Sequence, residues 1–213
     1  MENNLATYKL TFTNANLLIA IIAIHIINSL FSQTLFGTLL YSSMWLDPSL
    51  VSHSLQLWRL VTYGFVHDIN SPMHVILNSL VIYSIGSCLE KYLGTKKFII
   101  LISLALICGG FFVLSSYLLG LDNAIVVGFS AVSIALVIQW GLAFPNQKMY
   151  IFALIPISGK NIVFLTILIE ILSIFSTNNI SNTAHLGGIF SALVFNIYNQ
   201  KNLIMKKIRE YNE

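Results

Sequence analysis

The sequence has 213 residues, of which 56% are hydrophobic and 9% are charged, with a formal net charge of +3. Soluble domains carry about 25% charged residues, so this composition excludes an ordinary soluble domain and indicates a polytopic membrane protein. We expect one integrated membrane domain over residues 1–213. Cys88 and Cys108 both lie in apolar runs and fit no metal-binding spacing, so they indicate neither a disulfide framework nor a zinc site.

The predicted elements are apolar helices, since a membrane-spanning helix needs roughly 20 mainly apolar residues. In chain order they cover about 15–33, 73–92, 97–119, 124–143, 160–176 and 183–200. No small-residue cleavage pattern follows the first segment, so we interpret it as a retained helix and not as a signal peptide. The predicted fold class is therefore all-α, a bundle of six transmembrane helices.

Two connecting segments carry further information. The segment 34–72 is long, apolar and rich in aromatic residues, and we expect it on or in the outer leaflet of the bilayer. The apolar run Met149 to Ile157 is interrupted by Pro156 and followed by Ser158 and Gly159. We interpret this run as a cytosolic or interfacial piece that leads into the fifth helix.

The positive charges favour one orientation. On a six-helix topology, ten of the 11 Lys and Arg residues fall on one side, and only Arg59 falls on the other. The ten are Lys9, Lys91, Lys96, Lys97, Lys148, Lys160, Lys201, Lys206, Lys207 and Arg209. Because positive residues accumulate on the cytoplasmic side, we expect a multi-pass protein of a bacterial cell membrane with both termini in the cytoplasm.

Polar residues gather near the outer ends of the second, fourth and sixth predicted helices. His74 and Asn78 share one face of the second helix because they are four residues apart. Ser130 lies about two turns into the fourth helix and His185 lies in the first turn of the sixth. At about 1.5 Å of rise per residue, all four lie within roughly 10 Å of the same membrane face. A serine and a histidine are the minimum set for nucleophilic acyl transfer.

Each of these residues also has a purely structural interpretation. A serine in a membrane helix is usually a packing residue, and Asn78 alone would serve to tie two helices together. His25 has no polar companion and is interpreted as structural, whereas His53 and His67 are interpreted as solvated or interfacial. Glu170 is a charge in an apolar run, which by default marks function, but nothing in the sequence places it near the serine, and we leave it unassigned.

The start of the sixth helix favours close packing. Gly187, Gly188 and Ala192 form a small-residue face. Such a face would bring His185 close to Ser130.

Four motifs together resemble those of the rhomboid family of intramembrane serine proteases. They are Trp58-Arg59, His74-x-x-x-Asn78 followed by Glu90-x-x-x-Gly94, Gly128-Phe129-Ser130, and Ala184-His185-Leu186-Gly187-Gly188. The resemblance covers about 58–200 and departs from the family pattern at three positions. Ala131 and Ala192 stand where the family often has glycine, and Ile134 stands where it often has a tyrosine that stacks on the catalytic histidine.

This resemblance implies a rhomboid-like bundle and a mechanism. Ser130 is the implied nucleophile and His185 the general base, without a carboxylate, so that the two form a dyad. The implied groups around the oxyanion are the Ser130 N–H, His74, Asn78 and Gly128. The implied substrates are peptide bonds in or near transmembrane segments of membrane proteins in the lipid bilayer. No metal, cofactor or nucleic-acid partner is implied, and the oligomeric state stays open.

Two alternatives remain beside the protease. A catalytically weak or inactive rhomboid-like protein would bind membrane helices without cleaving them, although such binders usually lack one of Ser130, His185 and Asn78. A small transporter or channel would have polar residues along the full depth of the bilayer, whereas here they gather in its outer third.

Overall fold

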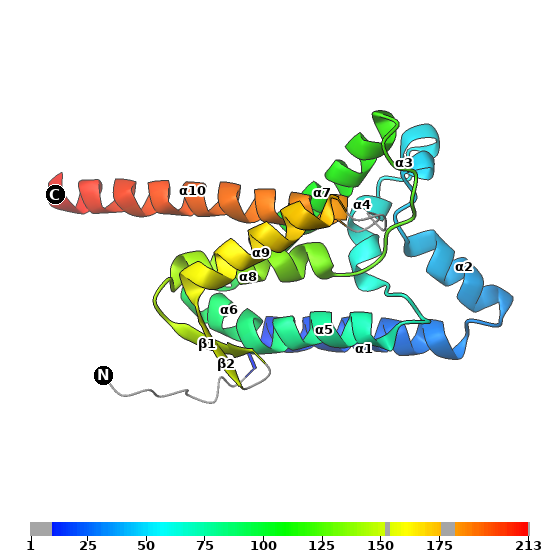
Figure 1. Cartoon of the computed structure of the whole chain (residues 1–213), viewed down its shortest axis with the longest axis horizontal. Coiled ribbons are helices and arrows are strands. Elements are labelled where there is room, and N and C mark those ends of the chain that lie inside the picture. The colour runs from blue at the N-terminus through cyan, green and yellow to red at the C-terminus, as the bar shows by residue number, and fades with distance from the viewer. Residues whose placement is uncertain (1–9, 152–153, 176–181, 213) are drawn as a thin grey trace.

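The computed structural model describes residues 10–151, 154–175 and 182–212. Helices dominate this part of the chain (Figure 1). In order they are α1 (Phe12–Leu30), α2 (Leu35–Met44), α3 (Pro48–Ser54), α4 (Arg59–Thr62), the 3-10 turn η1 (Tyr63–Phe65), α5 (Pro72–Val81), the π-helical turn η2 (Ile82–Gly86), α6 (Ser87–Leu93), α7 (Thr95–Leu118), α8 (Ser130–Ala143), α9 (Gly159–Ser173) and α10 (Asn182–Asn212).

Three of the described helices are long and apolar enough to cross a membrane. They are α1, the continuous helix from Pro72 to Leu93 that joins α5, η2 and α6, and α7. The protein is therefore an integral membrane protein. α8 has 14 residues and α9 has 15, which correspond to about 21 and 22 Å, less than the ~30 Å hydrocarbon core. Helix length thus does not decide the number of spans, and the six-span topology stays a prediction.

The helices pack around α8, which lies between α9 and α10 on one side and the α5–α6 helix on the other (Figure 1). α10 packs against both α7 and α8, and α1 lies beside α5. Fully buried apolar side chains fill the space between them, among them Ile21, Ile82, Phe98, Leu101, Ala135, Leu136 and Ile138. α8 is therefore surrounded by packed apolar side chains from its neighbouring helices.

A short β-hairpin connects α8 to α9. Its strands, β1 (Lys148–Ile151) and β2 (Ile155–Ser158), are antiparallel and place Pro156 opposite Tyr150. Each strand of a two-stranded sheet is an edge, where a proline is tolerated because its missing N–H can face away from the partner. The run before the fifth predicted helix is thus a hairpin.

The segment 34–72 is not an irregular loop but a helical layer formed by α2, α3, α4 and η1. Arg59 joins its parts, because Nη1 donates hydrogen bonds to the carbonyls of Ser42 and Trp45, each at 2.7 Å, at the end of α2. Trp58 Nε1 donates to the Ser43 carbonyl at 3.0 Å. Cations near the last carbonyls of a helix are favourable, so the lone cation of this segment has a structural position. α3 and α4 pack against α7.

The helical layer also determines where α8 begins. The predicted helix over 124–143 starts only at Ser130, so the prediction that Ser130 lies two turns inside it is wrong. Leu46 and Val126 exchange two backbone hydrogen bonds of 2.9 Å, and the Gly128 N–H donates to the Tyr63 carbonyl at 2.9 Å. Gly128 has φ +115°, which is incompatible with a helix. The backbone of Val126 and Gly128 therefore bonds to the 34–72 layer instead of to a helical turn.

Candidate active site

Ser130 occupies the first position of α8. The first N–H groups of a helix have no partner within that helix, so the backbone at Ser130 presents donors as well as a hydroxyl. The preceding Phe129 N–H donates to His67 Nε2 at 3.3 Å. The serine side chain is half-buried, so it is partly shielded from solvent but still accessible to another molecule.

His185 reaches Ser130 because α10 approaches its neighbours closely. A Cβ on Gly188 would lie 2.3 Å from the Ala131 carbonyl oxygen, and a Cβ on Gly187 would lie 2.6 Å from the Cys108 carbonyl oxygen. Only glycine permits such backbone contact, and the predicted close packing of this helix is confirmed. His185 Nε2 lies 2.8 Å from Ser130 Oγ. A base within hydrogen-bonding distance of a hydroxyl is the geometry that activates a nucleophile.

The other nitrogen of the His185 ring meets a carboxylate. Nδ1 lies 2.9 Å from Glu170 Oε2 of α9, and the two side chains are 16% and 11% exposed. The expectation that no acidic residue is positioned next to the histidine is therefore wrong. The sequence signal that could have found Glu170 is the rule that a charge in an apolar helix has a partner. That partner is on another helix, and its identity depends on how α9 and α10 pack.

His74 lies over the turn that precedes Ser130. A Cβ on Gly128 would come within 2.5 Å of both Cε1 and Nε2 of the His74 ring. The positive φ of Gly128 and this close approach both require glycine. Two of the predicted site residues, His74 and Gly128, are thus packed directly on each other beside the serine.

Asn78 is the hub of a buried hydrogen-bond network. Its Nδ2 donates to the His74 carbonyl at 3.1 Å and lies 3.2 Å from His67 Nε2, while its Oδ1 accepts from Ser133 Oγ at 2.8 Å. It is 4% exposed. These bonds tie α5 to α8 one turn beyond Ser130, so the structure places Asn78 behind the site and in contact with its supporting residues.

His67 belongs to this network and is fully buried, so the interpretation that it is solvated or interfacial is wrong. Burial, with smaller effects from His74 and His25, lowers the pKa of His67 to about 3. The ring is therefore neutral at pH 7, and its Nε2 can accept the Phe129 N–H. The His25 ring stands edge-on to His67 with 6.4 Å between centroids. Among the described residues this is a ring contact, and the buried His25 Nδ1 has no hydrogen-bond partner there.

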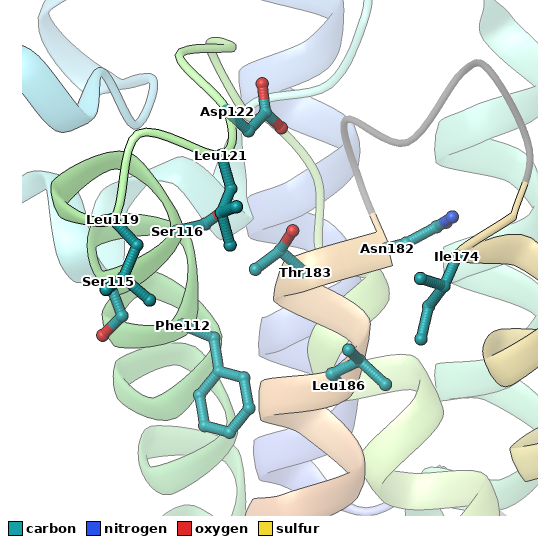
Figure 2. A pocket seen from close by; sticks show the side chains of 10 residues that line it. All are labelled: Phe112, Ser115, Ser116, Leu119, Leu121, Asp122, Ile174, Asn182, Thr183 and Leu186. Atoms are coloured by element: carbon teal, nitrogen blue, oxygen red, sulfur yellow. The ribbon is translucent and has the colours of Figure 1, made fainter.

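A cavity of about 700 Å³ opens beside the first turn of α10. Figure 2 shows it between the end of α7 and Thr183 and Leu186 of α10. Polar side chains from three elements line it, namely Ser115, Ser116, Asp122, Asn182 and Thr183. His185 lies in the same turn of α10 as Thr183 and Leu186, so the cavity opens next to the turn that carries the histidine.

Within the described ranges, no group of three or more His, Cys, Asp or Glu residues has the geometry to hold a metal ion.

Comparisons with known proteins agree with the motifs. A family model described as a rhomboid domain matches residues 54–201. The rhomboid protease GluP of Bacillus subtilis (strain 168) is 30% identical over 135 residues, which are 62% of this chain and 24% of that protein. The chain thus spans about a quarter of the length of that curated relative.

Proposed function

The chain belongs to the rhomboid family, and from this premise we propose that it is an intramembrane serine protease with Ser130 as nucleophile and His185 as general base. The observation that carries the proposal is the 2.8 Å contact between Ser130 Oγ and His185 Nε2 at the first residue of α8. A protein of this family that merely bound membrane helices would have no chemical need for this contact.

The proposed reaction begins with attack of Ser130 Oγ on the carbonyl carbon of a peptide bond. As the C–O bond forms, the hydroxyl proton moves to His185 Nε2, which later donates it to the leaving amine. The C–N bond breaks as the amine is protonated, which leaves an acyl-enzyme on Ser130. Water then attacks the acyl carbon and gives a proton to His185 Nε2, and this proton returns to Ser130 Oγ as the ester bond breaks and the carboxylic acid leaves. We propose that this water enters through the cavity between α7 and α10, which has polar side chains from Ser115, Ser116 and Thr183 in its lining.

The tetrahedral intermediate carries a negative oxygen that needs hydrogen-bond donors. We assign this role to the Ser130 N–H at the start of α8, where the helix dipole also favours negative charge. His74 is the second proposed donor. Its ring lies against Gly128, two residues before Ser130 in the chain. Asn78 is proposed as a third donor. To act in this way, one of its two amide N–H groups must leave its present acceptor, the His74 carbonyl or His67 Nε2.

The proposed substrates are transmembrane segments of other membrane proteins, which would be cleaved near the surface of the bilayer that lies closest to Ser130. Membership of the family and the relation to a bacterial rhomboid protease support this class of substrate. The proposed orientation places both termini in the cytoplasm of a bacterial cell, because ten of the 11 Lys and Arg residues then face inward.

A serine-reactive fluorophosphonate probe tests the proposal directly. Wild-type protein in detergent should be labelled and should cleave a model transmembrane substrate, and Ser130→Ala should do neither. Ser84→Ala is the matched control, because the Ser84 hydroxyl is exposed and, among the described residues, donates to the Leu80 and Val81 carbonyls of its own helix. Cleavage by Ser130→Ala at the wild-type rate would refute the proposed mechanism.

A further inference from the structure

Glu170 occupies an unusual position for an acidic residue. α9 exposes mostly apolar side chains, among them Phe164, Leu168, Ile169, Ile171 and Leu172. Its buried residues are Gly159, Ile162 and Glu170. A carboxylate within a membrane helix is costly in free energy unless it is paired. Since α9 exposes its leucines and buries Glu170, the residue that pairs with Glu170 must account for this arrangement.

The partner is the ring that also contacts the serine. Nδ1 of His185 lies 2.9 Å from Glu170 Oε2, and Nε2 of the same ring lies 2.8 Å from Ser130 Oγ. A neutral imidazole has one donor and one acceptor nitrogen, and the hydrogen-bond network decides which is which. A carboxylate only accepts, so Nδ1 carries the proton. Nε2 is then the acceptor and can receive the serine proton.

Contacts at both ends of α9 hold Glu170 in register with His185. At the start of α9, a Cβ on Gly159 would lie 2.2 Å from the Phe144 carbonyl oxygen, which locks α9 to the end of α8. At the other end, Asn182 Nδ2 donates to the Ser173 carbonyl at 2.7 Å. Ser173 and Asn182 are each three residues from the Glu170–His185 pair, so this bond fixes the same turn of both helices.

We infer that Glu170 is a positioning residue for His185, so that the catalytic unit is a Ser130–His185–Glu170 triad and not a dyad. This inference rests on the proposed function. Glu170 holds the Nδ1–H tautomer, and it stabilises the imidazolium that forms when the serine proton moves to Nε2. Glu170 takes no proton in this scheme, and the proton passes from Nε2 to the leaving amine.

The competing explanation is that Glu170 only ties α9 to α10. A tie needs a hydrogen bond, which glutamine also supplies because its amide oxygen accepts from Nδ1–H. Stabilisation of the imidazolium needs the negative charge, which glutamine lacks. Glu170→Gln therefore separates the two roles while leaving the volume of the side chain almost unchanged.

The kinetic test uses purified protein in detergent and a model transmembrane substrate. Glu170→Gln should lower kcat by roughly 10²-fold, at the lower end of what a general base contributes, with KM nearly unchanged. Glu170→Asp should recover part of kcat because it restores the charge. Glu90→Gln is the matched control, because Glu90 is also a buried carboxylate, 5% exposed, but accepts hydrogen bonds from Thr11 and Thr95 near the end of α6. It should keep the wild-type kcat.

The pH dependence of kcat provides a readout that a structural tie would not move. The described titratable groups that interact with His185 are Glu170 on α9 and His74 on α5. α8 presents Ser130 to the ring, and α7 meets α10 through the backbone of Cys108 and Gly109 at Gly187. Because Glu170→Gln removes a charge that favours the imidazolium, the acid limb of its kcat profile should move to lower pH.

A measurement without turnover keeps this inference separable from the proposed function. The chain has only five histidines, so 15N NMR of histidine-labelled protein can isolate the His185 signals by comparison with His185→Gln. Wild type should show the Nδ1–H tautomer, and Glu170→Leu should lose it. An Nε2–H tautomer in wild type, or wild-type kcat and pH profile in Glu170→Gln, would overturn the triad while leaving Ser130 chemistry intact. Absence of fluorophosphonate labelling and cleavage in wild type would instead refute the proposed function.

Discussion

The backbone of Gly128 and the ring of His74 are in such close contact that a single methyl group at Gly128 would lie 2.5 Å from two ring atoms. Gly128 also has φ +115°. We predict that Gly128→Ala abolishes cleavage, because the ring must move and the turn that presents Ser130 must change its backbone conformation. Substrate cleavage and thermal unfolding of the purified variant would measure the two effects.

Gly120 is the matched control for this substitution. It has φ +70° but no atom within 4 Å of an added Cβ. Gly120→Ala should therefore cost only about 1 kcal/mol of stability from backbone strain and should retain cleavage. Equal activity of the two alanine variants would contradict the importance of the Gly128–His74 contact.

The polar residues of the site should differ in their effects on activity. Ser130→Ala removes the nucleophile, and His185→Ala leaves an unassisted hydroxyl, so both should reduce cleavage to background. Loss of one oxyanion donor costs on the order of 10²–10³ in rate, and other donors should cover part of it in Asn78→Ala. His74→Ala should have the smallest effect, because Asn78→Ala also removes the hydrogen bonds that hold His67 and the His74 backbone in place. Initial rates with one transmembrane substrate would establish this order.

Asn78→Ala should also be the least stable of these four variants. The substitution removes the acceptor of the Ser133 hydroxyl and leaves His67 Nε2 with the Phe129 N–H alone. An unsatisfied buried polar group costs about 1–3 kcal/mol. The midpoint of thermal unfolding in detergent should fall for Asn78→Ala and stay near wild type for Ser130→Ala. A large drop for all four variants would return these residues to a structural role.

His67 should make the protein less stable in acid. Its pKa is lowered from 6.5 to about 3 in the folded protein, so the unfolded chain binds more protons between these values. The free energy of unfolding is therefore unaffected by His67 above pH 6.5. It decreases as the pH falls below 6.5, by up to about 1.4 kcal/mol per pH unit. Thermal unfolding between pH 7 and 4.5 should show this slope, and His67→Gln should flatten it.

The control for the acid effect is His53→Gln. His53 is exposed on α3, and its replacement should leave the pH slope of stability unchanged. A His67→Gln variant with the full wild-type slope would show that other groups cause the acid sensitivity.

The six-span topology predicts that Ser52 and Lys207 lie on opposite sides of the membrane. Single cysteines at these positions, in a background where Cys88 and Cys108 are serine, should react with an impermeant thiol reagent from opposite sides. Reaction of both from the same side would exclude the six-span topology. α8 and α9 are shorter than the bilayer core, so this experiment answers what helix length alone does not.

Several features of the protein could be predicted from the sequence because they depend on local composition. The apolar runs predicted the membrane class, and the spacing of His74 and Asn78 predicted a shared helix face. The small residues Gly187 and Gly188 predicted the close packing of α10, which brings His185 within 2.8 Å of Ser130. Periodicity and residue size are properties of neighbouring positions, so they can be read without knowledge of the fold.

Tertiary structure decided the features that depend on distant partners. α8 begins at Ser130 because Leu46 pairs with Val126 and because Gly128 bonds to Tyr63, contacts that span more than 60 residues. His67 is buried by packing against distant parts of the chain, and the Phe129 N–H satisfies its Nε2 there. Glu170 meets His185 because contacts at both ends of α9 set its register against α8 and α10. The hydropathy of a segment does not specify which polar group satisfies another across the bundle, since that depends on how the helices pack.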